Sequence, residues 1–285
     1  MQTLNFSNSA GTIEIGTSAP YYLQVLDGIS GLGTLAQEQR APNQNGTTLI
    51  NKVFDKRFVT ITGYMKACDY DTLNSQKRLL QKIFNPMSDV EMTYSNETYS
   101  KKITLSTENA PKFTADKGRR YQIFTVNLVA YEPFLVDLEE STEEMSVTLK
   151  NLVFPLICEP DLEFETNGAE TIAISNEGDI ETPVEIYFYG PAENPKVINE
   201  TTGEFIEVTK TLLDGEVLYI NTQFGNKQVL FTDSSSVQSN AFGLINLDSE
   251  FFQLQKGNNV LSYSADSGTD TANVLINYSN KYIGF

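Results

Sequence analysis

Polar and apolar residues alternate over short runs in the first part of the chain. In the segment FDKRFVTITGYM (residues 54–65), Val59 and Ile61 fall on one face, whereas Phe58, Thr60 and Thr62 fall on the other. A period of two residues is typical of a half-buried β-strand. Similar runs occur in TIEIG, YYLQVLDG, VEMTY, KKITLST and RRYQIFTVNLVAY. We therefore expect residues 1–136 to form a domain built mainly from strands.

The segment DYDTLNSQKRLLQKIFNP (residues 69–86) has a helical period instead. Its apolar residues with this spacing are Leu73, Leu80, Ile83 and Phe84. Asp71 is a candidate N-cap, and Lys82 falls in the last turn, where a positive charge suits the helix dipole. Pro86 ends the pattern, because the residue before a proline avoids helical geometry. The segment predicts a helix over about residues 71–85.

The pattern changes after residue 136. LVDLEESTEEMSV (residues 135–147) is acidic and lacks glycine, as expected for a connector or an exposed strand edge. Beyond it, short strand-like runs alternate with turn residues up to the closing FFQLQKGNNVLSYSADSGTDTANVLINYSNKYIGF. This arrangement is typical of an antiparallel β-sandwich, and no fixed-period repeat is present. We expect residues 137–285 to form a second domain.

Charge divides the chain at the same place. Residues 1–135 carry 14 Lys and Arg against 12 Asp and Glu, whereas residues 136–285 carry 6 against 25. A domain with a net charge of −19 repels nucleic acid, and a nearly neutral one gains little from counterion release, so we expect no nucleic-acid recognition. No apolar run is long enough to cross a bilayer. No signal peptide is visible either, which favours a protein that stays in the cytoplasm or leaves it by a route other than secretion.

The composition also limits catalysis. The chain contains no histidine, which excludes Ser-His-Asp and Cys-His nucleophiles and histidine-ligated zinc or copper. Cys68 and Cys158 are far apart and lack metal-ligand spacing. We interpret them as two reduced, buried thiols with packing roles; the alternative is one long-range disulfide.

Three short motifs have a functional and a structural interpretation. GISGLG (residues 28–33) departs from the dinucleotide-binding pattern and precedes no helix, so we interpret it as a turn. DSGTD (residues 266–270) lacks the ligand spacing of a calcium loop and favours a hairpin turn, although the acidic half leaves a calcium site possible. Glu163 and Glu165 fall on the same strand face and could act as a glycosidase pair, but acidic residues are so frequent here that such pairs arise by chance.

The aromatic residues of EIYFYG (185–190) and FFQL (251–254) could stack on sugars. Alternating aromatics on strands more often fill the core between two sheets. We therefore expect these residues to lie in the core.

Together, these segments resemble the distal tail proteins of tailed bacteriophages, especially long-tailed phages of Gram-positive bacteria. In the first half the resemblance rests on YYLQVLDGISGLG, QRAPNQNGTTL, FDKRFVTITGYM, LLQKIFNP and FTVNLVAYEPF. In the second half it rests on ISNEGDIETPVEIYFYGPAENPKVINETTGEFIEV, DGEVLYINT, FFQLQKGNNVLSY and INYSNKYIGF. None of these is a catalytic signature.

The resemblance implies a mainly β fold: a β-barrel-like or split-barrel N-terminal domain with one helix, followed by a galectin-like antiparallel β-sandwich. It implies a structural, non-enzymatic virion protein without a cofactor or metal. Such proteins form a ring, usually six-membered and in some cases paired back to back, which joins the tail tube to the tip or baseplate. The implied partners are further copies of the chain, the tail tube protein, a tail-tip, tail-associated lysin or hub protein, and a receptor-binding protein. The implied location is the virion tail tip, assembled in the cytoplasm of a Gram-positive host; prophages and phage-tail-like particles contain related proteins.

The resemblance leaves the contacts and the role of the sandwich open. Loop character and basic charge make Arg40, Pro42, Asn45, Gly46 and Arg57 the candidates for ring contacts. Residues 136–285 contain no histidine, arginine or tryptophan, which sugar-binding galectins use, so we interpret the sandwich as scaffold. The alternative is a carbohydrate-binding module that recognises host wall polymers through the sandwich, and a glycan hydrolase is a third hypothesis.

Overall fold

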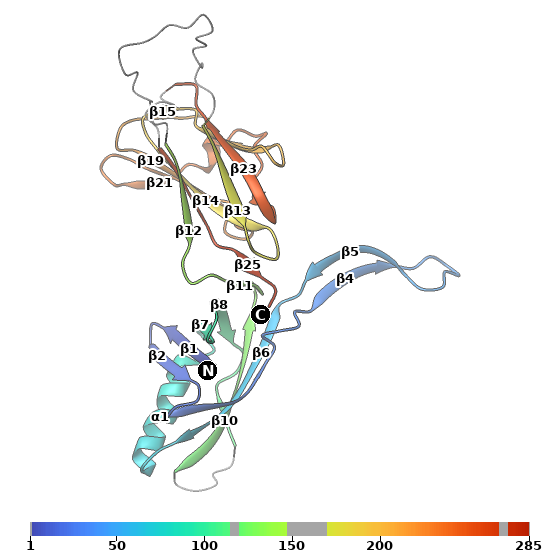
Figure 1. Cartoon of the computed structure of the whole chain (residues 1–285), viewed down its shortest axis with the longest axis vertical. Coiled ribbons are helices and arrows are strands. Elements are labelled where there is room, and N and C mark those ends of the chain that lie inside the picture. The colour runs from blue at the N-terminus through green and yellow to red at the C-terminus, as the bar shows by residue number, and fades with distance from the viewer. Residues whose placement is uncertain (1, 115–119, 147–169, 268–272, 285) are drawn as a thin grey trace, which may run out of the picture. The chain divides into compact units, whose positions relative to one another are not determined.

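The computed structural model describes residues 2–114, 120–146, 170–267 and 273–284 (Figure 1). The chain divides into two compact units. The first contains residues 1–138 together with 281–285, and the second contains residues 139–280. The sequence-based division lies two residues earlier, between 136 and 137, and does not predict that residues 281–285 return to the first unit.

One large antiparallel sheet forms most of the first unit. Its strands follow the order β2-β1-β7-β8-β10-β6-β3, and three short strands join it at the side. The bounds are β1 (Thr3–Asn8), β2 (Gly11–Ile15), β3 (Tyr21–Asp27), β6 (Arg57–Lys66), β7 (Asp89–Ser95), β8 (Ser100–Thr107), β9 (Lys112–Phe113), β10 (Tyr121–Ala130), β11 (Leu135–Val136) and β25 (Lys281–Tyr282). The alternation predicted for β6 is confirmed, because Val59 and Ile61 are fully buried while Phe58 is 49% exposed.

Helix α1 (Tyr70–Ile83) covers part of this core. Its N-cap is Asp69, whose carboxylate accepts from the backbone N–H of Thr72 at 2.7 Å. The prediction that Asp71 caps the helix is wrong, because Asp71 already lies in the first turn. At the other end, buried Phe84 packs edge-on against Phe6, with ring centroids 5.0 Å apart.

The second unit is a β-sandwich. One sheet has the order β12-β24-β14-β19-β20-β21, with β22 beside β14, and the other has the order β13-β23-β16-β17. Apolar side chains from both sheets meet in one core that includes Phe188, Leu218, Val197 and Tyr263. The bounds are β12 (Ser141–Ser146), β13 (Glu170–Asn176), β14 (Thr182–Tyr189), β15 (Ala192–Glu193), β16 (Lys196–Asn199), β17 (Glu204–Glu207), β18 (Thr211–Leu212), β19 (Val217–Asn221), β20 (Gln228–Thr232), β21 (Gln238–Asn240), η1 (Phe242–Leu244), β22 (Gln253–Leu254), β23 (Gly257–Ser264) and β24 (Asn273–Tyr278). The prediction of a mainly β protein with a C-terminal sandwich is confirmed.

Two predictions about single residues need correction. Cys68 is exposed and free, not a buried thiol, because it lies in the short connection between β6 and α1. Cys158 lies outside the described residues. The core prediction for the aromatics is right for Phe188 and Phe252, each 1% exposed. It is wrong for Tyr187 and Tyr189, which alternate with Phe188 and therefore lie on the opposite face of β14.

Several motifs lie wholly or partly beyond what the structure describes. The carboxylate pair Glu163 and Glu165 falls outside the described residues, as does most of DSGTD. In the described part of the chain, no group of three or more His, Cys, Asp or Glu side chains is placed to hold a metal ion. No helix there has the length and apolar character needed to cross a membrane.

Candidate functional site

A two-stranded hairpin of the first unit stands apart from its sheet. Strands β4 (Thr34–Gln39) and β5 (Thr48–Phe54) pair with each other and with no other described strand. Every residue of both strands is exposed. In Figure 1 the hairpin leaves the end of β6 and extends away from the sheet of this unit. Apart from Phe54, whose ring packs edge-on against Phe134 with centroids 5.4 Å apart, the hairpin leaves its edges and faces open to a partner.

The hairpin loop contains four of the five predicted contact residues. Arg40, Pro42, Asn45 and Gly46 lie together between the strands and are all exposed. Gln44 organises the loop: its backbone oxygen accepts from Arg40 Nε at 3.1 Å, and its side-chain Oε1 accepts from the backbone N–H of Ala41 at 2.9 Å. These bonds hold an exposed loop in a defined shape.

The strands of the hairpin expose large apolar side chains. Leu35 and Val53 are opposite each other in the pairing register and are 55% and 51% exposed. Leu49, Ile50 and Phe54 are 56%, 55% and 39% exposed. Full burial of one such side chain contributes about 1.5–3 kcal/mol of favourable free energy. A partner that covers this hairpin would therefore stabilise the complex by burying side chains that are exposed in the isolated chain. Sequence reasoning chose the loop and overlooked these strand residues, although their apolar character is visible in TLINKVF.

Arg57, the fifth predicted contact, is the first residue of β6, just after the hairpin, and is only 2% exposed. Its Nε donates to the backbone oxygen of Pro133 at 2.7 Å. One terminal nitrogen donates to the backbone oxygens of Gly28, at 3.1 Å, and Ile29. The other donates to the oxygen of Ile283 at 2.6 Å. Burial lowers the pKa of Arg57. A side chain buried in this way offers little surface to a neighbouring copy, and within this chain Arg57 acts as an internal clamp.

The backbone around this clamp needs glycine at position 28. Gly28 has a positive φ of 89°. A Cβ there would lie 1.7 Å from the backbone oxygen of Phe58, far inside van der Waals contact. GISGLG is therefore a tight turn against β6, in keeping with the structural interpretation of that motif.

The C-terminal residues complete the same region of the first unit. Strand β25 pairs with β11, matching Tyr282 with Leu135 and Lys281 with Val136. The ammonium of Lys101 lies 3.6 Å from the centre of the Tyr282 ring, and Lys281 pairs with Glu132. The two chain segments that lead to the second unit thus begin on adjacent strands of the first.

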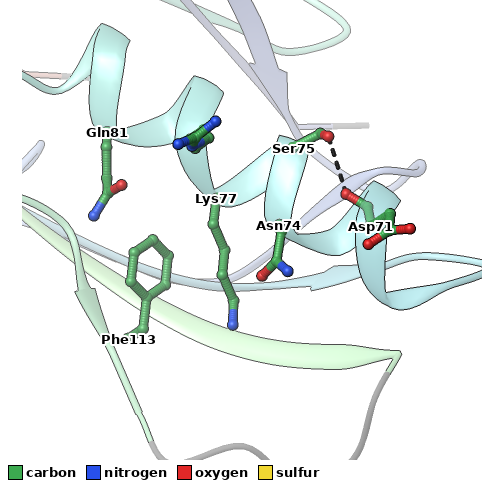
Figure 2. A pocket seen from close by; sticks show the side chains of 7 residues that line it. Asp71, Asn74, Ser75, Lys77, Gln81 and Phe113 are labelled. Carbon is green, nitrogen blue, oxygen red and sulfur yellow. Dashed lines mark hydrogen bonds between the residues drawn. The ribbon is translucent and has the colours of Figure 1, made fainter.

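Helix α1 borders a surface groove of about 580 Å³. Figure 2 shows Asp71, Asn74, Lys77 and Gln81 on the helix, with Phe113 of β9 opposite. The ammonium of Lys77 lies 5.8 Å from the centre of the Phe113 ring. The groove mixes both charges and presents no catalytic constellation, so it defines no ligand class.

Known protein families match both units of the chain. Residues 9–130 match the phage tail protein RIFT-related domain, and residues 177–282 match the siphovirus-type tail component, C-terminal domain. These matches define a two-domain phage tail protein. The chain belongs to the siphovirus-type tail component family and is a structural tail protein. No curated protein sequence matches it significantly.

Solved structures share the fold over the full length. The Dit protein of phage SPP1, described as a paradigm of the hub adsorption apparatus in phages that infect Gram-positive bacteria, is 12% identical with a TM-score of 0.68, and the match covers 99% of each chain. A chain of the phage P2 baseplate in its activated conformation with Ca is 8% identical, with a TM-score of 0.58 over 100% of this chain and 99% of that one. The corresponding structure with Sr gives 8% identity and a TM-score of 0.57 over 100% of each. At these identities the likeness shows the shared fold.

Proposed function

We propose that this tail protein is the subunit of a distal hub ring, in which six copies join the tail tube to the tail tip or baseplate. The observation that carries the proposal is the hairpin β4–β5, whose apolar residues are exposed in the single chain. In the ring, the hairpin of each copy lies against the first unit of the next. Its ordered loop, with Arg40, Pro42, Asn45 and Gly46, contributes polar contacts, and the buried Arg57 anchors the start of β6, the strand that follows the hairpin.

The charge distribution agrees with this arrangement. The first unit carries 15 Lys and Arg against 13 Asp and Glu, a net charge of +2, so copies of it can approach with little repulsion. The second unit carries 5 against 24, a net charge of −19. Second units repel one another, and they are best accommodated at the periphery of a ring. At physiological salt the screening length is about 8 Å, which limits this repulsion to short range.

The proposed partners follow from this position. The ring contacts the tail tube protein on one side and a tail-tip, tail-associated lysin or hub protein on the other, with a receptor-binding protein carried outside. We place it at the tail tip of a virion or a phage-tail-like particle, assembled in the cytoplasm of a Gram-positive host. The role is structural and involves no catalysis.

Native mass spectrometry of the full-length chain tests the ring directly. Over a concentration series at physiological salt, we expect a discrete hexamer or a double ring of twelve. Replacing the loop at residues 40–47 with a short Gly-Ser turn should abolish this species while the second unit stays folded by circular dichroism. A chain that remains monomeric throughout, or a loop variant that assembles normally, contradicts the proposal.

A further inference from the structure

The outer face of one sandwich sheet carries an organised set of polar and aromatic side chains. On β14, Val184, Ile186 and Phe188 are at most 1% exposed and belong to the core. The alternate residues, Glu185 and Tyr187, therefore lie on the outer face and are partly exposed. Tyr189 continues this outer row and is 38% exposed.

The pairing register aligns these residues with neighbours into two rows. The apolar row crosses strands β24, β14, β19 and β20 and consists of Leu275, Tyr187, Tyr219 and Leu230. The polar row crosses the same strands and consists of Asn277, Glu185, Asn221 and Gln228. Adjacent strands are about 4.8 Å apart, so each row extends over roughly 14 Å. We call the two rows together the outer platform.

Hydrogen bonds fix the centre of the outer platform. The amide nitrogen of Asn221 donates to Glu185 Oε1 and to the hydroxyl of Tyr219, both at 3.1 Å. The hydroxyl of Tyr187 donates to Glu185 Oε2 at 3.3 Å. Asn221 is only 3% exposed, so its amide is held in place. The Glu185 carboxylate thus accepts from Asn221 and Tyr187 and also interacts with the Tyr219 hydroxyl, which leaves about one of its roughly four lone-pair sites for a ligand.

The two central tyrosines offer neutral hydroxyls and ring surface. Burial, together with the nearby charge of Glu185, raises the pKa of Tyr187 and of Tyr219 to about 12. Their rings are 4.9 Å apart and inclined by 49°, so they form a ridged surface instead of a closed stack. Such rings bind apolar C–H groups, while their hydroxyls remain in the polar network.

This combination matches the chemistry of a sugar chain. A pyranose presents C–H groups on its ring face and hydroxyls around its edge. The outer platform presents an apolar row beside a polar row in which Glu185, Asn277 and Gln228 are partly exposed. The unit's net charge of −19 and the central Glu185 oppose polyanionic wall polymers. We propose that the outer platform of β24, β14, β19 and β20 binds a neutral polysaccharide of the host cell wall.

The ligand site would lie on the second unit, whereas the proposed ring contact lies on the first. A failure of either proposal therefore leaves the other standing. The site also differs from a galectin-type groove, because tyrosine, glutamate and asparagine replace the histidine, arginine and tryptophan that residues 136–285 lack.

Binding of the full-length chain to an array of neutral and anionic wall glycans tests the proposal, followed by titration calorimetry with the strongest neutral oligosaccharide. The variants are Glu185→Gln, which keeps the shape and removes the charge, and Tyr187→Ala. The matched controls are Glu204→Gln on β17 of the other sheet and Tyr131→Ala, an exposed tyrosine of the first unit. Thermal unfolding checks that every variant is folded.

We expect binding to neutral glycans that each platform variant weakens about tenfold or more and that neither control changes. The proposal is overturned by no binding to any neutral glycan, by preference for anionic glycans, or by equal loss in controls and platform variants. A platform that instead retains a tail protein partner, with no glycan bound, also overturns it and reassigns the face to protein contact.

Discussion

Arg57 connects three parts of the first unit that are distant in sequence. Its guanidinium donates to carbonyl oxygens of the turn after β3, of the loop after β10 and of the C-terminal segment. A planar guanidinium has five donors in a fixed geometry, so one side chain can serve all three segments. Lysine has a single nitrogen at the end of a flexible chain and cannot reproduce this pattern.

We therefore predict that Arg57→Lys lowers the free energy of unfolding of the first unit by about 2–5 kcal/mol, because buried carbonyl oxygens lose charged donors. Urea unfolding monitored by circular dichroism measures the change, with the two units analysed as separate transitions. Arg40→Lys, at an exposed loop position, is the matched control. Equal midpoints for the two variants would show that the buried bonds contribute little.

At the scale of elements, the hairpin β4–β5 leaves large apolar side chains exposed in the isolated chain. We predict that Leu35→Asp abolishes assembly and leaves a folded monomer, because a carboxylate on this face must lose its hydration when a partner covers it. Circular dichroism should be unchanged, since Leu35 is 55% exposed and supports no core. Sedimentation velocity distinguishes monomer from ring.

Leu213→Asp in the second unit is the control for this change, because Leu213 is also exposed, at 62%. It should assemble like the unchanged chain. If Leu35→Asp still forms the full ring, the apolar face of the hairpin is not the contact.

The sequence predicted the elements that depend on local patterns. Alternation in β6 and helical spacing in α1 follow from which side chains must reach a core, and both were confirmed. The N-cap was missed by two residues because Asp69 and Asp71 are equally suitable in composition. The choice depends on the backbone angles, which are extended at Asp69.

The pairing of strands that are far apart in the sequence could not be predicted from local patterns. Strand β25 is only two residues long and pairs with β11, about 146 residues earlier, so no local pattern marks it. The outer platform was likewise hidden, because EIYFYG shows alternation but not which of Tyr187 and Phe188 faces the other sheet. That choice is made by packing across the sandwich, where Phe188 meets Tyr263 at 6.0 Å between ring centroids.

At the scale of the whole molecule, the chain starts and finishes the first unit and inserts the second between β11 and β25. Two chain segments therefore attach the second unit. A pulling force on the second unit would act on the paired strands β11 and β25 together. The attachment of the second unit is therefore part of the sheet of the first unit.

This topology predicts that a change at the far end of the sequence weakens the first unit. Deleting residues 281–285 removes β25, the Ile283 carbonyl that accepts from Arg57, and the contact of Tyr282 with Lys101. We expect a loss of about 2–4 kcal/mol in the first unit and little change in the second, because several hydrogen bonds and a cation–π contact disappear from one side only. Hydrogen exchange measured by mass spectrometry should show faster exchange in β8 and β11, whereas β14 and β19 keep their protection.

Deleting only residues 284–285 retains those contacts and serves as the control. If the longer deletion leaves exchange in β8 and β11 at the control level, the C-terminal segment rests on a first unit that is already complete, and the second unit is effectively held by one connection.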